Sequence, residues 1–339
     1  MKHRLFTIDF VRTVAIIGVM VTHSLVPFLG KQSINSTWNY LHFVVVAFVF
    51  CSGYITVYSY PRSNTGRSLP AWCKKRFRRL YLPYLIYLFV YAVALFLFPA
   101  VVTGRDISLT TRFFLDSITL TGGSDVGWLT LLFLQLAVLT PILPGITRNN
   151  KRLTGSLIIC GFFALITTFV RIPASYSRMI AWLPWSFIFL LGALAGQKEK
   201  HDGAKIQNYL IAGMVSFCVW IIFTALLNYL HKPLTLTLHK YPPDLYYFLY
   251  GIGITYTLFG LGKLWEKQGE HFTSAISFIS RYSYGMFFTH LIILDAVTKT
   301  IHQGNVFTTI GISVASTLLL TWGGTILLRK FNTSQVPKS

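Results

Sequence analysis

The chain is divided into long, mostly apolar runs separated by short polar segments, and this pattern limits its fold more than any other feature. A helix needs about 20 residues to cross the hydrocarbon core of a bilayer. Runs of about this length predict an all-α fold, a polytopic membrane bundle of about ten transmembrane helices. The expected spans cover residues 8–28, 38–60, 80–100, 126–146, 153–170, 179–196, 209–230, 245–264, 278–297 and 307–328.

The composition agrees with a surface that mostly faces lipid. Only 12% of the residues are charged and 53% are hydrophobic, whereas a soluble domain carries roughly a quarter charged residues. In a soluble protein the net charge of +20 would suggest a nucleic-acid partner. Here lysine and arginine gather in the short segments between apolar runs, as membrane topology requires, so we expect no nucleic acid.

Lysine and arginine are also divided unequally between alternate loops. The side that holds both chain ends carries more than twice as many as the other side. Because cytoplasmic loops carry this excess, we expect the N- and C-termini to be cytoplasmic. Residues 1–331 are expected to form one membrane domain, and residues 332–339 a short polar cytoplasmic tail.

The cysteines give no sign of a metal site or a disulfide framework. Cys51, Cys160 and Cys218 lie inside apolar runs, and Cys73 lies in a basic loop. They form no CxxC pattern, and no histidine stands at zinc spacing from them. We therefore expect no bound metal.

The first span carries three ionisable side chains, Asp9, Arg12 and His23. Such groups are costly inside a bilayer and persist where they face a protein interior. Arg12 and His23 are eleven residues apart, which places both on one helix face, about 16 Å apart along the axis. His23 is a candidate general base, because histidine titrates near neutral pH. The alternatives are an Arg12 that snorkels to lipid headgroups and a His23 wetted from outside.

The ninth span carries His290, with Ser283 two turns earlier on the same face. This span is expected to cross in the same direction as the first, so His290 can share a level with His23. His290 is a second catalytic candidate and Ser283 a candidate substrate contact. The alternative for His290 is a core histidine that is hydrogen-bonded across the bundle. Asp295, near the outer boundary, is interpreted as interfacial.

Four further positions are candidate substrate contacts: Asp9, Ser52, Trp128 and Gln135. Trp128 and Gln135 lie two turns apart on one stripe of the fourth span. The alternatives are structural. A buried glutamine can bridge two helices, and small residues such as Ser52 and Gly53 let helices approach closely.

The segment before the third span is the densest basic patch of the chain. Arg76 and Arg79 are spaced for one helix face. Guanidinium groups suit phosphates, so these arginines are predicted to bind a phosphorylated cytoplasmic donor. The alternative is attraction to anionic lipid. On the outer side, residues 121–128 and 231–247 combine aromatic and polar side chains, which suits either a lip for a sugar chain or an interfacial aromatic belt.

Several motifs, in chain order, resemble acyltransferase family three, a group of bacterial integral membrane acyltransferases. Residues 8–12, Ile-Asp-Phe-Val-Arg, followed by His23, resemble its first-helix signature, and residues 48–55 resemble its second-helix motif. Residues 75–84 resemble its basic third-helix start, residues 126–129 its fourth-helix motif, and residues 280–290 its Ser-Tyr-Gly-Leu-Tyr-Leu-Leu-His motif. Staphylococcal members of the intercellular adhesin locus are also similar.

The resemblance implies an enzyme of the bacterial cell membrane. It would transfer an acyl group, most often acetyl from acetyl-CoA, to a hydroxyl of a cell-surface or exported polysaccharide. The resemblance makes Arg12 and His23 the essential pair and assigns Arg76 and Arg79 to the basic motif. The partners it implies are acyl-CoA, a surface carbohydrate, the lipid bilayer and polysaccharide synthesis machinery. The staphylococcal members have been linked to polysaccharide export and to O-succinylation, which leaves acetyl and succinyl donors open.

The alternative function is a polysaccharide exporter or flippase without acyl transfer. Such a protein is expected to show inverted repeats and broken helices near the midplane. The sequence shows no paired repeat, although prolines interrupt several expected spans, at Pro83, Pro141, Pro144 and Pro184. We therefore favour an acyltransferase in which His23 takes a proton from the acceptor hydroxyl or from an intermediate.

Overall fold

The computed structural model describes residues 5–58, 69–98, 110–170, 172, 174–203, 205–266, 273–300 and 305–334, which form helices and their connections. The α-helices are α1 (Phe6–Leu25), α2 (Gln32–Tyr40), α3 (Val44–Tyr58), α4 (Leu69–Leu97), α6 (Thr111–Thr119), α7 (Gly127–Leu139), α8 (Leu143–Thr147), α9 (Asn150–Phe169), α10 (Ala174–Ile180), α11 (Trp182–Asp202), α12 (Ile206–Tyr229), α13 (Leu245–Glu266), α14 (Thr273–Thr300) and α15 (Val306–Ser334). Short 3-10 helices are η1 (Val26–Phe28), η2 (Leu41–Phe43) and η3 (Leu236–His239).

Each predicted span coincides with a helix of the structure. Within the described residues, 8 helical stretches are long and apolar enough to cross a membrane. The fourth predicted span is the shorter apolar helix α7, which is 13 residues long. The ninth is α14, which is 28 residues long but more polar. The all-α membrane bundle is therefore confirmed, whereas the cytoplasmic placement of the termini stays a prediction.

The polar residues of α14 are explained by its contact with α1. Ser280 donates a hydrogen bond to Asp9 at 2.6 Å, and Ser277 donates to the same carboxylate at 3.1 Å. One turn further along α1, Arg12 donates to Ser283 at 2.8 Å. Polar groups that satisfy one another across two helices are tolerated at membrane depth. The contact therefore lets α14 lie inside the bundle despite its low hydropathy.

The helices α3 and α11 form the most extensive helix contact in the described chain. A Cβ atom added to Gly53 of α3 would lie 1.9 Å from the carbonyl oxygen of Phe189, and one added to Gly192 of α11 would lie 2.0 Å from that of Phe50. Only glycine permits backbones to come this close. Gly53 therefore serves helix packing, as one interpretation of this motif predicted, while the neighbouring Ser52 lines an interior cavity.

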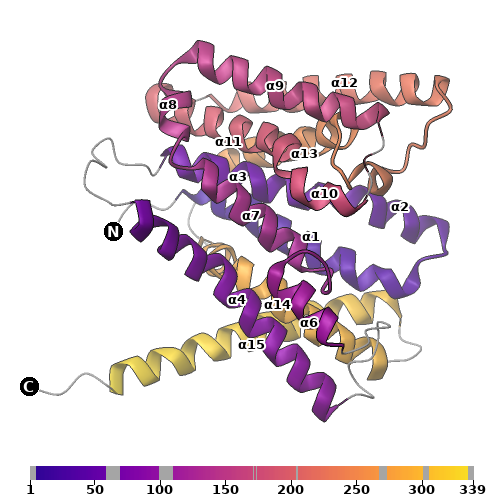
Figure 1. Cartoon of the computed structure of the whole chain (residues 1–339), viewed down its shortest axis with the longest axis vertical. Helices are drawn as coiled ribbons and strands as arrows, with labels where there is room; N and C mark the ends of the chain where they lie inside the picture. The colour runs from indigo at the N-terminus through magenta and orange to yellow at the C-terminus, as the bar shows by residue number, and fades with distance from the viewer. Residues whose placement is uncertain are drawn as a thin grey trace, which may run out of the picture.

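The helix α4 crosses the bundle obliquely in Figure 1, with α15 below it and with α9 and α12 at the far edge of the bundle. The start of α4 and the end of α15 lie on the same side of the bundle (Figure 1). Two tyrosines of α4 hold the short helix α6: Tyr81 donates to the carbonyl oxygen of Ile118 at 2.5 Å, and Tyr84 to that of Ser117 at 2.9 Å. These bonds tie α6 to the middle of α4, directly after its basic segment.

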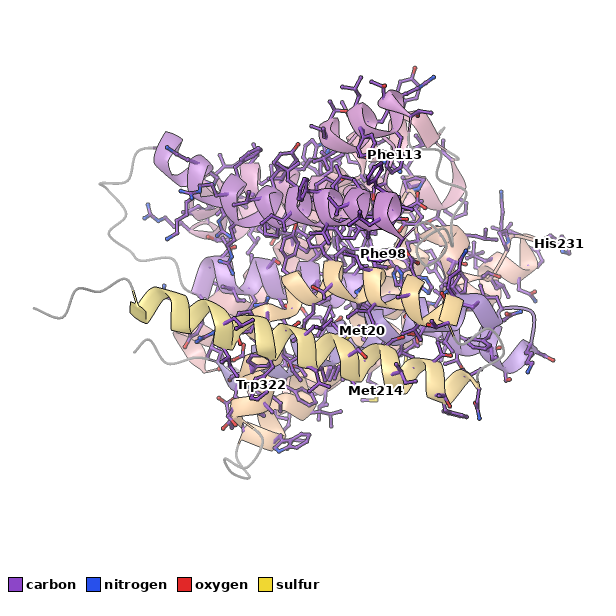
Figure 2. All side chains as sticks on the ribbon, turned by 90° about the horizontal axis from the view of Figure 1, so that it is seen from below. Met20, Phe98, Phe113, Met214, His231 and Trp322 are labelled. Atoms are coloured by element: carbon purple, nitrogen blue, oxygen red, sulfur yellow. The ribbon has the colours of Figure 1, made fainter. Side chains whose placement is uncertain are left out.

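The connection from α12 to α13 forms a folded loop. His231, in this loop, lies at the end of the bundle opposite to the C-terminal end of α15 (Figure 2). The buried ring of His239 pairs through Nδ1 with Asp244, and its Nε2 lies 2.8 Å from the carbonyl oxygen of Pro233. Burial alone would lower the pKa of His239, but the hydrogen bond and charge of Asp244 raise it above its usual value. This pair fixes the part of the loop that carries Lys240.

Candidate functional site

A cavity of about 320 Å³ lies beside the basic part of α4. We call it the arginine cavity, because guanidinium groups from three helices line it. They belong to Arg12 of α1, Arg76 and Arg79 of α4, and Arg281 of α14. No aspartate or glutamate is among its lining residues in the described chain. Its surface is therefore strongly positive, which suits a ligand with several phosphate charges.

Arg12 is oriented toward this cavity by α14. Its Nη2 donates to the hydroxyl of Ser283 at 2.8 Å, and that hydroxyl donates to the carbonyl oxygen of Ser280 at 2.9 Å. Val11, beside it on α1, is fully buried in the core, so the helix presents Arg12 from a fixed backbone. Arg12 therefore faces a protein-lined space, and does not simply reach out to lipid headgroups.

A second cavity, of about 720 Å³, lies between α1, η2, α7 and the loop from α12 to α13. We call it the histidine cavity, because His23 of α1 and His42 of η2 line it. The two outer loops that the sequence singled out meet here. Trp128 and Tyr241 both line the cavity, with their ring centroids 5.1 Å apart. His23 thus faces an interior space that is rich in aromatic and polar groups.

Three apolar side chains line both cavities: Phe48 of α3, Leu129 of α7 and Phe287 of α14. We call them the waist, because they stand where the two cavities meet. Arg12 and His23 lie on α1 on opposite sides of it, about 16 Å apart along the helix. Arginines therefore lie on one side of the waist and the His23 imidazole on the other.

The rings of His23 and His290 lie together. Their centroids are 5.2 Å apart and their planes meet at 89°. His290 is buried, and its Nδ1 lies 3.0 Å from the carbonyl oxygen of Met286. A carbonyl oxygen only accepts, so Nδ1 carries a proton in this arrangement, and in the neutral ring the lone pair is on Nε2. The structure thus places the two predicted catalytic histidines in direct contact across α1 and α14.

Comparison with known proteins adds a family. Residues 5–329 match the acyltransferase domain of the acyltransferase 3 family. The chain belongs to this family. It is a multi-pass membrane acyltransferase, as the motifs predicted. The match identifies the family and no particular member, and comparisons with curated proteins and with solved structures give no match.

The acyltransferase carries its remaining predicted substrate contacts in different places. Ser52 and Ser283 line the arginine cavity, and Trp128 lines the histidine cavity. Asp9 is among the lining residues of neither, because its carboxylate is buried against α14. Gln135 lies beside a small third cavity, and its amide donates to the carbonyl oxygens of Arg178 and Met179, each at 3.4 Å. Gln135 therefore connects α7 to α10.

Sequence reasoning passed over three cations of the acyltransferase that line the cavities. Arg281 joins the arginine cavity, and Lys240 and Arg178 join the histidine cavity. In the sequence Arg178 counted only as a charge near a span end, and Lys240 was not singled out within the outer loop of residues 231–247. One signal was available for Arg281, because it lies two residues before Ser283 in the ninth-span motif. The waist carried no signal, since apolar residues are common in every span.

Proposed function

We propose that the acyltransferase moves an acetyl group from cytoplasmic acetyl-CoA to a hydroxyl of a cell-surface or exported polysaccharide. One observation carries this proposal. A cavity lined by arginines and a cavity lined by His23 meet at the waist, inside a single membrane domain. Lysine and arginine are in excess in the loops on one side of the predicted topology, the side on which Arg76 and Arg79 lie. This excess supports a cytoplasmic opening for the arginine cavity.

The donor binds in the arginine cavity. Arg76 and Arg79 take its phosphates, because guanidinium groups match phosphate oxygens in pairs. Arg281 faces the same space from α14, and Arg12 faces it from α1. The thioester arm of the donor is long and slender. It passes between the side chains of the waist, and its acyl carbon reaches the side of His23.

Transfer requires a base beside the acceptor hydroxyl. His23 takes the hydroxyl proton while the acceptor oxygen forms a bond to the thioester carbon and the carbon–sulfur bond breaks. The proton then passes from His23 to the leaving thiolate. His290 positions the His23 ring through the contact between the two imidazoles, and its own ring is held by the Met286 carbonyl. Donor and acceptor therefore enter from opposite ends of one interior.

The test uses purified protein, labelled acetyl-CoA and a polysaccharide acceptor. Replacing His23→Ala should lower transfer by about 100-fold to 10,000-fold, the usual contribution of a general base. His231→Ala, at an exposed loop position, should leave transfer unchanged. Normal transfer by the His23→Ala variant would exclude His23 as the base. Absence of any transfer or donor hydrolysis by the native protein, with polysaccharide export intact in cells, would favour an exporter.

A further inference from the structure

The histidine cavity contains two cations that the transfer step does not use, Lys240 and Arg178. Asp125 is the only acidic residue among its lining residues in the described chain. Across the described residues, neither cation forms a salt bridge with it or with another carboxylate. Charged groups at the edge of a membrane domain are costly unless they meet water or a counter-ion. The net positive charge of this cavity therefore favours an anion over a neutral ligand.

Lys240 is held by aromatic rings and not by an acid. Its Nζ lies 5.4 Å from the ring centroid of Trp128 and 5.1 Å from that of Tyr241, within cation–π range. Burial lowers the pKa of Lys240 to about 8, so most of it stays charged at neutral pH. Ring faces attract the charge but accept no conventional hydrogen bonds. The three N–H donors of Lys240 are therefore available to an anion in the cavity.

Arg178 approaches the same cavity from α10. Its Nη1 is buried and has no hydrogen-bond partner in the described part of the chain. A buried donor without a partner is destabilising, and more so when it is charged. The backbone of α10 is tied to α7, because Gln135 donates to the carbonyl oxygen of Arg178. The guanidinium is thus held at the wall of the cavity with a hydrogen-bonding direction unused.

We propose that the acceptor is itself an anion, a hydroxyl-bearing saccharide that carries a phosphate or a carboxylate, and that Lys240 and Arg178 bind this group. This inference rests on the proposed function, because it names the substrate class of the same cavity. Trp128 and Tyr241 provide flat apolar surfaces for the sugar ring beside the anion. Binding the anion at this wall directs a neighbouring hydroxyl toward His23, which lines the same cavity.

The experiment measures binding of three matched probes to the purified full chain without donor: glucose 6-phosphate, glucuronate and glucose. At low salt, at least one anionic probe should bind about tenfold or more tightly than glucose, and added salt should reduce the difference. The tighter of the two anions identifies phosphate or carboxylate as the preferred group. A wild-type protein that binds both anions no better than glucose, or binds none of the probes, would overturn the proposal.

Variants assign the effect to the cavity. Lys240→Gln and Arg178→Gln should each reduce the preference for the anion by about tenfold, and Lys240→Arg should retain it. Lys232→Gln is the matched control, because Lys232 is an exposed lysine of the same loop that does not line the cavity. An unchanged preference in Lys240→Gln and Arg178→Gln would overturn the assignment. His23→Ala should bind the anion normally while it loses transfer, so failure of the acyl-transfer mechanism and failure of anion binding are separate results.

Discussion

The two cavities of this protein differ in the kind of charge they present. The arginine cavity gathers guanidinium groups from α1, α4 and α14 with no acidic neighbour among its lining residues as described. The histidine cavity combines two imidazoles, two cations, one carboxylate and several aromatic rings. A uniform positive surface suits one ligand of high, fixed negative charge, whereas a mixed polar and aromatic surface suits a ligand recognised by several weaker contacts. The difference supports our proposal that the donor binds in the first cavity and the acceptor in the second.

The largest expected effect is a loss of donor binding that leaves acceptor binding unchanged. The double change Arg76→Gln and Arg79→Gln should raise KM for acetyl-CoA about 100-fold or more, because each hydrogen bond between charged groups contributes about 1.5–3 kcal/mol. KM for the acceptor should stay the same. Steady-state kinetics with each substrate varied in turn measures both. The control is Lys74→Gln with Lys75→Gln, exposed positions of the same helix. An equal rise in both KM values would contradict the division.

The next effect concerns the waist. Phe287→Ala removes a large side chain from the waist, which leaves more room for a longer acyl chain. The rate with hexanoyl-CoA relative to acetyl-CoA should therefore rise about tenfold. Competition between the two donors measures this ratio directly. The control is Phe89→Ala, which removes the same ring from a position of α4 that is 70% exposed. If the ratio is the same in both variants, the acyl chain does not pass the waist.

A smaller effect is expected from Ser283→Ala. The change removes the hydrogen bond that orients Arg12, which corresponds to about 1 kcal/mol, or about fivefold in kcat. The acceptor affinity should not change, because Ser283 lines the arginine cavity. Thr289→Ala is the control, since its hydroxyl bonds only within its own helix, to the carbonyl oxygen of Gly285. A loss confined to acceptor binding would argue against this placement.

The smallest expected effect is a change with pH in the preference of the histidine cavity for an anionic ligand. Because the pKa of Lys240 is lowered to about 8, its charge is present below that pH and is lost above it. The preference for the tighter anionic probe over glucose should therefore fall several-fold between about pH 7 and pH 9. Asp125, Arg178, His23 and His42 face the same cavity. Lys240→Arg, which keeps its charge over this range, should show a flatter profile, and a preference that rises with pH would contradict the assignment.

The helices could be predicted from the sequence because hydropathy is a local property of each run. The partial exception, α14, is instructive. Its polar positions lowered its hydropathy, yet Ser277, Ser280 and Ser283 are the residues that hold Asp9 and Arg12 of α1. In the sequence Ser283, Asp9 and Arg12 stood out but were not paired, and Ser277 did not stand out. Spacing shows which residues share a helix face and gives no information about which helix lies opposite.

One part of the candidate site, the alignment of Arg12 with His23, could also be predicted from a local property of the sequence. Arg12 and His23 share one face of one helix, so their alignment follows from spacing alone. The places of Arg281 and Lys240 in the two cavities, in contrast, depend on contacts between distant segments. Lys240 reaches Trp128 because the loop from α12 to α13 folds against the start of α7, a contact fixed by the pair of His239 and Asp244. Such a contact depends on tertiary structure, which charge counting along the chain does not capture.

The glycine contact between α3 and α11 has a consequence for turnover. With Gly53 and Gly192 already touching the opposite backbone, α3 has no room to shift toward α11. The backbone that carries Phe48 at the waist therefore cannot approach α11 more closely. The other two sides of the waist belong to α7 and α14, which carry Leu129 and Phe287. We therefore expect any widening of the waist for a thioester to involve α7 and α14, or α3 and α11 moving together as one unit.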